Sequence, residues 1–404
     1  MTSHADDGAD LVAAAVTNPE THGAVEVAGK TSYAPWHLPR KQLCRFEQWL
    51  TGIDALRREL YTSREPGRNF RYLSLPGDEL LDLRVLTKAF GDPEGPQIAF
   101  TGFNAMGGGP RRAESDLSLN ELRAHPAIVR EGSVVLDRRI EEVGEEDSVG
   151  YREFLQRAPF DAVNLDLTSS VGSDPPLTAG SVMQAISNIL HAQINNRREP
   201  WLLFLTTPLG RPPRMSEGAL RQLHGPLLKN ARQTEFRTGM AAVLDLAEGS
   251  ISGGYEALAG LDEGSFARVI ALALSKWFVG LATERPDPWD LTLTSLYVYR
   301  VAEPSPDMFS FAFRFAPVET HAVDSTGLTL PVGSARPGRS ELEVALGILD
   351  AMGETQDIDR TLTDDPAVLQ QAISLTEQML LDARFDVAPY RDWALTTMRE
   401  RGLV

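Results

Sequence analysis

The sequence has a single cysteine, Cys44, which excludes an internal disulfide and any zinc site built from several cysteines. It also lacks H-E-x-x-H, G-x-S-x-G and G-x-x-x-x-G-K-[ST] motifs, so nothing in the sequence supports a zinc protease, an α/β-hydrolase or a P-loop nucleotidase. No apolar run approaches the roughly 20 residues of a membrane-spanning helix. We therefore predict no metal site and no membrane segment. Because the N-terminus has no secretory-signal pattern, we expect a cytoplasmic protein.

Positive charge is also scarce, since the formal net charge is -17. Such a charge disfavours indiscriminate binding to nucleic acid, which depends on phosphate neutralisation by Lys and Arg. The first 29 residues contain acids but no Lys or Arg, which predicts an acidic mobile tail over 1–29. The charge balance reverses at Lys30, and we take 30–68 as an aromatic-basic arm followed by a helix.

The arm contains the sequence YAPWHLPRKQLCRFEQWL. Pro35 and Pro39 predict an extended stretch, and apolar residues at helical spacing predict a helix from Gln42 to Leu60. Rings that stack on bases, together with cations that meet phosphates, suit single-stranded nucleic acid. The residues predicted for nucleic-acid or partner contact are Trp36, Arg40, Lys41, Arg45 and Trp49. The alternative is that these side chains pack the arm against the protein's own acidic body.

From residue 69 the pattern changes to strand-like apolar runs that alternate with helical stretches. The runs cover 70–77, 97–103, 133–140, 160–167 and 201–207, at the spacing of βα units. Right-handed crossovers then give a parallel sheet covered by helices. Two alternating runs at 291–301 and 308–315 predict an antiparallel hairpin. We assign 69–316 to an α/β domain and 317–404 to an acidic helical C-terminal extension, which either binds a protein partner or covers the sheet.

The most informative segment is FDAVNLDLTSSV, residues 160–171. Asn164 and Asp166 interrupt an otherwise apolar run, where polar side chains are costly to bury without partners. They share a face of the predicted strand and lie at its carboxyl end, where open α/β sheets bind ligands. Both side chains are therefore candidates for one ligand site. The alternative is that they satisfy neighbouring backbone groups.

This order of elements resembles the class I S-adenosylmethionine-dependent methyltransferase superfamily over roughly 69–316. The resemblance implies a Rossmann-like three-layer α/β fold with a mostly parallel, seven-stranded sheet and a C-terminal antiparallel hairpin. The 160–167 strand then corresponds to motif IV, which implies that Asn164 and Asp166 are catalytic and accept hydrogen bonds from a substrate amine. The sequence around this strand is similar to that of nucleic-acid methyltransferases, and to bacterial methyltransferase-like proteins of antiviral defence loci.

The resemblance also implies S-adenosylmethionine as the cofactor, at the ends of the first three strands. The cofactor-binding residues that it implies are Ser74, Gly77, Asp78, Asn104 and Asp137. The first strand departs from the family pattern, because YLSLPGDELLDL has one glycine where relatives carry an acid and G-x-G. Two functions therefore stay open, a methyltransferase acting on nucleic acid and a catalytically inactive subunit of a defence or nucleic-acid-processing complex. A dinucleotide-dependent oxidoreductase is disfavoured by the absence of G-x-G-x-x-G.

Overall fold

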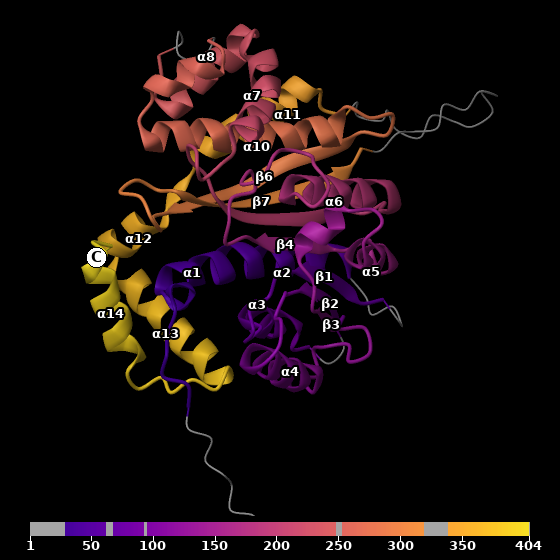
Figure 1. Cartoon of the computed structure of the whole chain (residues 1–404), viewed down its shortest axis with the longest axis vertical. Coiled ribbons are helices and arrows are strands. Elements are labelled where there is room, and N and C mark those ends of the chain that lie inside the picture. The colour runs from indigo at the N-terminus through magenta and orange to yellow at the C-terminus, as the bar shows by residue number, and fades with distance from the viewer. Residues whose placement is uncertain (1–28, 62–67, 93–94, 248–252, 319–337, 404) are drawn as a thin grey trace, which may run out of the picture.

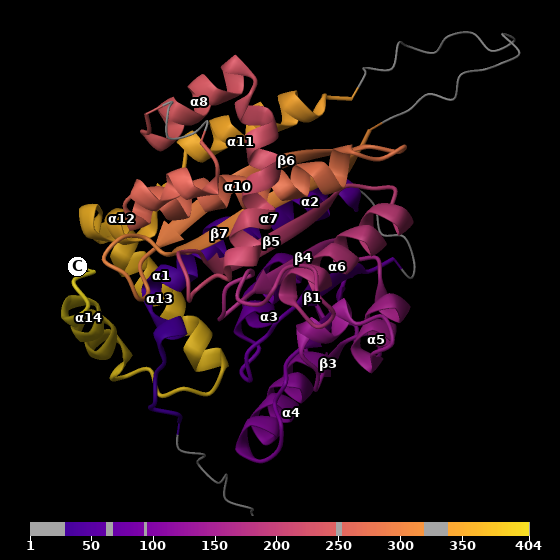
Figure 2. The ribbon, with the colours of Figure 1, turned by 45° about the horizontal axis from the view of Figure 1, so that its top comes forward.

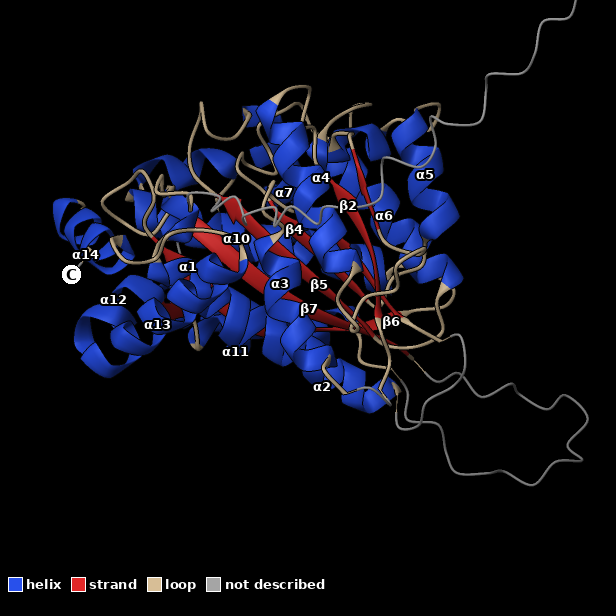
Figure 3. Cartoon of the chain, turned by 90° about the horizontal axis from the view of Figure 1, so that it is seen from below, coloured by secondary structure: helices blue, strands red, loops and turns tan. Residues whose placement is uncertain are grey.

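The computed structural model describes residues 29–61, 68–92, 95–247, 253–318 and 338–403. Except for Gly29, the predicted acidic tail lies outside these residues. The described strands form one mixed sheet with the order β3-β2-β1-β4-β5-β7-β6-β8, which Figure 3 shows as a twisted band of strands between helices. The strands are β1 (Phe70–Ser74), β2 (Ile98–Phe103), β3 (Val134–Leu136), β4 (Ala162–Asp166), β5 (Trp201–Pro208), β6 (Trp289–Tyr299), β7 (Met308–Pro317) and β8 (Gln356–Asp357).

The predicted α/β class is confirmed, but the expected seven-stranded, mostly parallel sheet is corrected to an eight-stranded mixed one. The strands from β3 to β5 pair in parallel, and β7 is antiparallel to both of its neighbours, β5 and β6. The eighth strand, β8, has two residues and pairs in parallel with β6. Its brevity explains why no alternating pattern indicated it.

Alternate residues of each strand face opposite sides of the sheet, as strand geometry requires. Leu73, Val163 and Leu203 belong to the core beneath one set of helices. Tyr72 and Ala162 belong to the core on the other face. Figure 1 shows α7, α8, α10 and α11 on one side of the sheet, and α1, α2, α3, α4 and α13 on the other.

The helices on the first face are α5 (Val149–Arg157), α6 (Val182–Asn196), α7 (Glu217–Ala231), α8 (Thr234–Leu244), α10 (Glu263–Thr283) and α11 (Glu341–Gly353), with the short η4 (Ile140–Gly144) and η5 (Tyr255–Gly260). Among the described helices, α10 alone is long and apolar enough to cross a membrane. Because 78% of its apolar window is buried inside the protein, this helix fits the role of a core helix. The cytoplasmic location stays a prediction.

The arm is helical from Pro35 onward except at Leu38, which is extended, so the long extended stretch that we predicted there is wrong, whereas the helix predicted for 42–60 is confirmed. It forms η1 (Pro35–His37), α1 (Pro39–Leu43), the π-helix η2 (Cys44–Leu50) and α2 (Thr51–Leu60). Pro35 and Pro39 each occupy the start of a helix. A proline costs little there, because the N–H that it lacks has no partner within the helix.

The C-terminal extension after α11 folds back over the arm, on the same face as α3 (Leu81–Leu86), η3 (Thr87–Phe90) and α4 (Pro110–Arg123), as the two views in Figures 1 and 2 show. It contains α12 (Ile358–Asp364), α13 (Pro366–Asp382) and α14 (Tyr390–Glu400). The Tyr390 hydroxyl donates to the His37 carbonyl at 2.7 Å, which links α14 directly to η1. α12 also packs against β6, and α13 packs against α1 and α3, so these helices cover the arm and the end of the sheet next to it. Protein binding by their outer surface stays a prediction.

Candidate functional site

A pocket of about 510 Å³ opens at the carboxyl ends of β1 to β4. It lies where the strand order reverses between β1 and β4, the usual ligand position in an open α/β sheet. Its volume is within the range of small-molecule sites. The residues that line it include Trp36, Arg45, Trp49, Pro76, Gly77, Asp78, Glu79, Asp82, Asn104, Arg111, Arg138, Arg139, Glu141, Asn164, Asp166, Thr168 and Ser169.

The floor of the pocket contains a buried chain of hydrogen bonds. The Asn164 Nδ2 donates to the Tyr72 hydroxyl at 2.9 Å, and that hydroxyl is 3.2 Å from the Asp82 carboxylate, to which it donates. Burial raises the pKa of Asp82, although Arg45 and nearby hydrogen-bond donors oppose the shift. The Asn164 Oδ1 is buried without a hydrogen-bond partner among the described residues. The floor thus offers a free acceptor and an acid whose charge a cationic ligand would stabilise.

Asp166, at the end of β4, forms an ion pair with Lys41 from α1. The Lys41 Nζ is 2.6 Å from Asp166 Oδ1 and 4.9 Å from the centre of the Trp49 ring. Burial acts to lower the pKa of Lys41, but Asp166, Tyr299 and Cys44 act to raise it, and the net shift is upward. Lys41 is therefore a cation at neutral pH and not a general base. The Asp166 side chain stays 30% exposed and lines the pocket.

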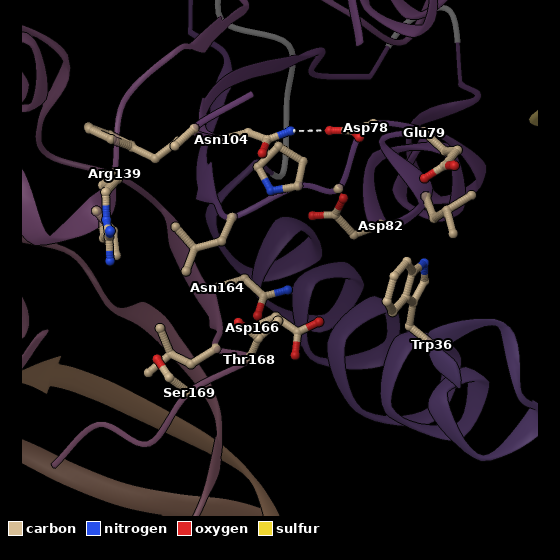
Figure 4. A pocket seen from close by; sticks show the side chains of 18 of the residues that line it. Trp36, Asp78, Glu79, Asp82, Asn104, Arg139, Asn164, Asp166, Thr168 and Ser169 are labelled. Carbon is tan, nitrogen blue, oxygen red and sulfur yellow. Dashed lines mark hydrogen bonds between the residues drawn. The ribbon is translucent and has the colours of Figure 1, made fainter. Parts of the chain in front are cut away.

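The loops after β1 and β2 are joined at the pocket's edge. Asp78 accepts a hydrogen bond from Asn104 at 2.9 Å, as Figure 4 shows, and another from the Arg111 guanidinium at 2.8 Å. Beneath them, Pro76 packs closely on β2, since a Cβ added to Gly102 would lie 2.7 Å from the Pro76 Cγ. This loop therefore follows a proline-stiffened path in place of a glycine-rich one. At Gly77 an added Cβ would meet only the Glu79 carboxylate, at 3.8 Å, so a ligand can approach the backbone there.

Of the predicted cofactor-binding residues, Gly77, Asp78 and Asn104 line the pocket. Ser74 is buried at the end of β1 and does not line it. Asp137 is also outside the lining, where its carboxylate accepts from the Met106 amide at 2.9 Å and from Arg112 at 3.1 Å. Asp137 therefore shapes the loop that follows β2.

Of the five arm residues, only Trp36 is exposed, by 53%, and it lies at the pocket (Figure 4). Arg40 is buried 3.8 Å from Asp359, and Lys41 is paired with Asp166 as above. Arg45 and Trp49 are buried too, although both line the pocket. Arg40, Lys41, Arg45 and Trp49 thus pack inside the protein, as the alternative interpretation of the arm predicts.

Several residues of the pocket and of the hydrogen-bond chain beneath it carry no distinctive signal in the sequence. Tyr72 lies in an apolar strand, and Asp82 stands in a segment with an ordinary helical pattern. Arg139 and Glu141 belong to a charged stretch that solvent exposure explains equally well. Only the strand order, which places β1 between β2 and β4, brings these side chains to one place, as Figure 4 shows for Asp82, Arg139 and Asn164.

The polar groups of the pocket fit S-adenosylmethionine, which carries two cationic groups, a carboxylate and an adenosine. Glu79 and Asp82 supply negative charge for the cations. Arg45, which is buried with its Nε unpartnered among the described residues, supplies positive charge for a carboxylate. Asn164 Oδ1 is a further free acceptor. In the described part of the chain, no group of His, Cys, Asp and Glu side chains is arranged to hold a metal ion.

Comparison with known proteins identifies the family. The chain belongs to the PP_RS20740-like family, whose sequence profile matches residues 30–395. No curated protein matches the chain. The matched region includes the arm, the sheet domain and most of the C-terminal helices, so the parts that surround the pocket belong to one family unit.

Proposed function

We propose that this protein is an S-adenosylmethionine-dependent methyltransferase of divergent class I type that acts on an amino group of a nucleic acid. The observation that carries the proposal is the pocket at the β1–β4 reversal, with Asn164 and Asp166 on its wall. Five parallel strands followed by an antiparallel hairpin support it, because the resemblance implies the same elements. The edge strand β8 is an addition to those elements.

When bound, the cofactor would supply a methyl group attached to a positively charged sulfur. Glu79 and Asp82 would bind the cationic part, and Arg45 would bind the carboxylate. Backbone near Gly77 and the amide of Asn104 would lie along the adenosine. Because Asp82 is buried, a bound cation would also favour its ionised form.

Asn164 and Asp166 would bind the methyl acceptor. Their oxygens would accept hydrogen bonds from an amine and hold its lone pair in line with the methyl group, so rate enhancement would come mainly from orientation. The ion pair with Lys41 fixes the position of the Asp166 carboxylate. No covalent nucleophile is needed. Trp36, exposed at the pocket, gives a flat surface on which a base can stack.

A second function, a catalytically inactive subunit of a defence or nucleic-acid-processing complex, has one observation in its favour. Asp78 is already paired with Arg111 and Asn104, so two residues that the methyltransferase resemblance assigns to the cofactor contact each other here. In that case the pocket would be inherited but unused. The protein would then serve as a binding or scaffold component.

Calorimetric titration of the full chain with S-adenosylmethionine separates the two functions. The methyltransferase proposal requires binding, and a methyl-transfer assay on amine-bearing oligonucleotides should then lose activity in Asn164→Leu while binding is retained. Asp116→Asn, a change on the exposed surface of α4, is the matched control. Absence of binding would refute the proposal, and binding without transfer to any nucleic acid would favour the inactive subunit.

A further inference from the structure

Trp36 is the one exposed tryptophan of this chain. All six tryptophans lie within the described residues, and Trp36 is 53% exposed, whereas the others are buried or partly buried. A large ring in water forgoes the free energy that its burial would provide. Because Trp36 lines the pocket at the carboxyl ends of β1 to β4, its ring is accessible at the site that we assign to the methyl acceptor.

The faces of the Trp36 ring are free of other rings, while its backbone is held in place. Among the described residues, its single ring contact is an edge contact with His37, with 5.8 Å between the centroids and an angle of 77° between the planes. Arg45 Nη1 donates to the Trp36 carbonyl at 3.2 Å, and the Tyr390 hydroxyl donates to the His37 carbonyl at 2.7 Å. A ring on a fixed backbone loses little conformational entropy when a flat ligand stacks on it.

Two arginines that follow β3, Arg138 and Arg139, also line the pocket. Figure 4 shows Arg139 on the side opposite Trp36. The Arg139 side chain is 69% exposed and is 2.7 Å from Glu141, and the Arg138 side chain is 3.8 Å from Glu142. A guanidinium has five N–H donors, so each arginine keeps donors for a phosphate in addition to its acidic neighbour.

The acids beside these arginines decide which form of nucleic acid fits. Glu141 and Glu142 offset the charge of the two arginines, and the formal net charge of the whole chain is -17. A duplex carries one negative charge per about 1.7 Å of its axis, so its affinity depends on many uncompensated cations. Its bases also stack on one another and offer no face to a ring unless one is flipped out. An unpaired base offers its face directly, and stacking depends little on charge.

We propose that the pocket takes an unpaired base of a single-stranded nucleic acid, with Trp36 stacked on that base and Arg138 and Arg139 on a phosphate beside it. The inference rests on the proposed function, because it takes this pocket as the place of the methyl acceptor. It adds the form of nucleic acid and the residues that select it. Figure 4 shows Asn164 and Asp166 between Trp36 and Arg139, where the amino group of the base would lie.

Fluorescence anisotropy with labelled oligonucleotides of about 12 nucleotides tests the proposal on the full chain without S-adenosylmethionine. Single-stranded DNA or RNA should bind at least tenfold more tightly than the duplex of the same sequence. Trp36→Leu, which keeps an apolar side chain but removes the ring, should weaken single-strand binding about tenfold, and Trp36→Phe should retain most of it. Leu155→Ala, at an exposed apolar residue of α5 outside the pocket, is the matched control and should leave the affinity unchanged.

The salt dependence of binding separates stacking from phosphate contacts. Each phosphate contact to a single strand contributes about 0.7 to the slope of the logarithm of affinity against the logarithm of salt concentration. The double variant Arg138→Gln with Arg139→Gln should therefore lower this slope by about 1.4, whereas Trp36→Leu should leave it unchanged. Arg152→Gln, at an exposed arginine of α5 outside the pocket, is the control for the loss of positive charge.

Equal affinity for single strand and duplex would overturn the proposal, as would unchanged single-strand affinity in Trp36→Leu or an unchanged salt slope in the double arginine variant. Thermal melting verifies that each variant is folded, and if Trp36→Leu does not fold, the double arginine variant and the duplex comparison decide. A separate calorimetric titration with S-adenosylmethionine tests the proposed function. Cofactor binding without a preference for single strands refutes this inference alone, whereas that preference without cofactor binding refutes the methyltransferase and leaves the single-strand site.

Discussion

The ion pair between Lys41 and Asp166 allows a quantitative test, because its two partners differ in burial. The Lys41 side chain is 7% exposed, and the Asp166 side chain is 30% exposed. Removing one member of a buried pair leaves the other charge without compensation, at a cost of about 3–5 kcal/mol when that charge is fully buried. The cost of each substitution therefore depends on which charge remains.

Asp166→Asn leaves the buried ammonium of Lys41, and we expect it to lower the free energy of unfolding by about 3 kcal/mol. Lys41→Met leaves the more exposed carboxylate of Asp166, which water can partly solvate, so we expect a loss of only about 1–2 kcal/mol. The double variant should be more stable than the sum of the two losses predicts, since it leaves no unpaired charge. Urea unfolding followed by tryptophan fluorescence and circular dichroism measures all four proteins.

The pH dependence should differ in sign between wild type and Asp166→Asn. In the wild type the pKa of Lys41 is raised, so the pair's contribution is complete below the ordinary lysine pKa of about 10.4 and is lost as pH rises through the folded-state value. In Asp166→Asn, burial dominates and lowers the pKa of Lys41. That variant should therefore gain stability as pH approaches about 10.4 from below.

The surface pair of Arg112 and Asp116 in α4 is the matched control. Both side chains are about half exposed and 3.3 Å apart, so breaking the pair should cost less than about 0.5 kcal/mol. Equal and similarly small losses for Lys41→Met and Asp166→Asn, with additive effects in the double variant, would refute the argument. That result would mean that Asp166 carries no special constraint at the pocket.

Three further predictions follow from local contacts. Gln48→Leu should lower the free energy of unfolding by about 2 kcal/mol or more, because it leaves several buried groups unpaired. Gln42→Leu should leave the free energy of unfolding unchanged or raise it, because the amide that it removes has no partner among the described residues. Urea unfolding compares the two variants. Gly102→Ala should cost about 1–3 kcal/mol through its clash with the loop after β1, and Gly108→Ala, which meets nothing within 4 Å, should be close to neutral in thermal melting. Cys44 is buried and burial raises its pKa, so it should resist a thiol reagent at pH 8 until the protein is unfolded; rapid labelling of the native protein would contradict this placement.

The strands were predictable because their signal is local. The apolar runs at 160–167 and 201–207 correspond to β4 and β5, and the alternating runs at 291–301 and 308–315 correspond to β6 and β7. The spacing of apolar residues identifies such strands even when the strands that pair with them are unknown. The pair Asn164 and Asp166 was identifiable for a related reason, since polar residues in an apolar run require a special environment.

The arm was harder, because its residues look the same whether they face solvent, nucleic acid or a buried carboxylate. The partner of Lys41 is 125 residues away in the chain, and that of Arg40 lies in the C-terminal extension. The two prolines also permitted either an extended chain or a helix start. No local pattern distinguishes these cases.

The sequence by itself determined the α/β class, most of the strands and the segment on which the site is centred, because hydrophobic periodicity and buried polarity are written in neighbouring residues. Only the tertiary structure decided which side chains form the pocket. It joined Asp82 to Tyr72 and Asn164, paired Lys41 with Asp166, buried the arm beneath the C-terminal helices and left the amide of Gln42 without a partner among the described residues. The physical reason is that a charge or an amide acquires its role from its partners and its exposure to water, and both depend on residues far away in the chain.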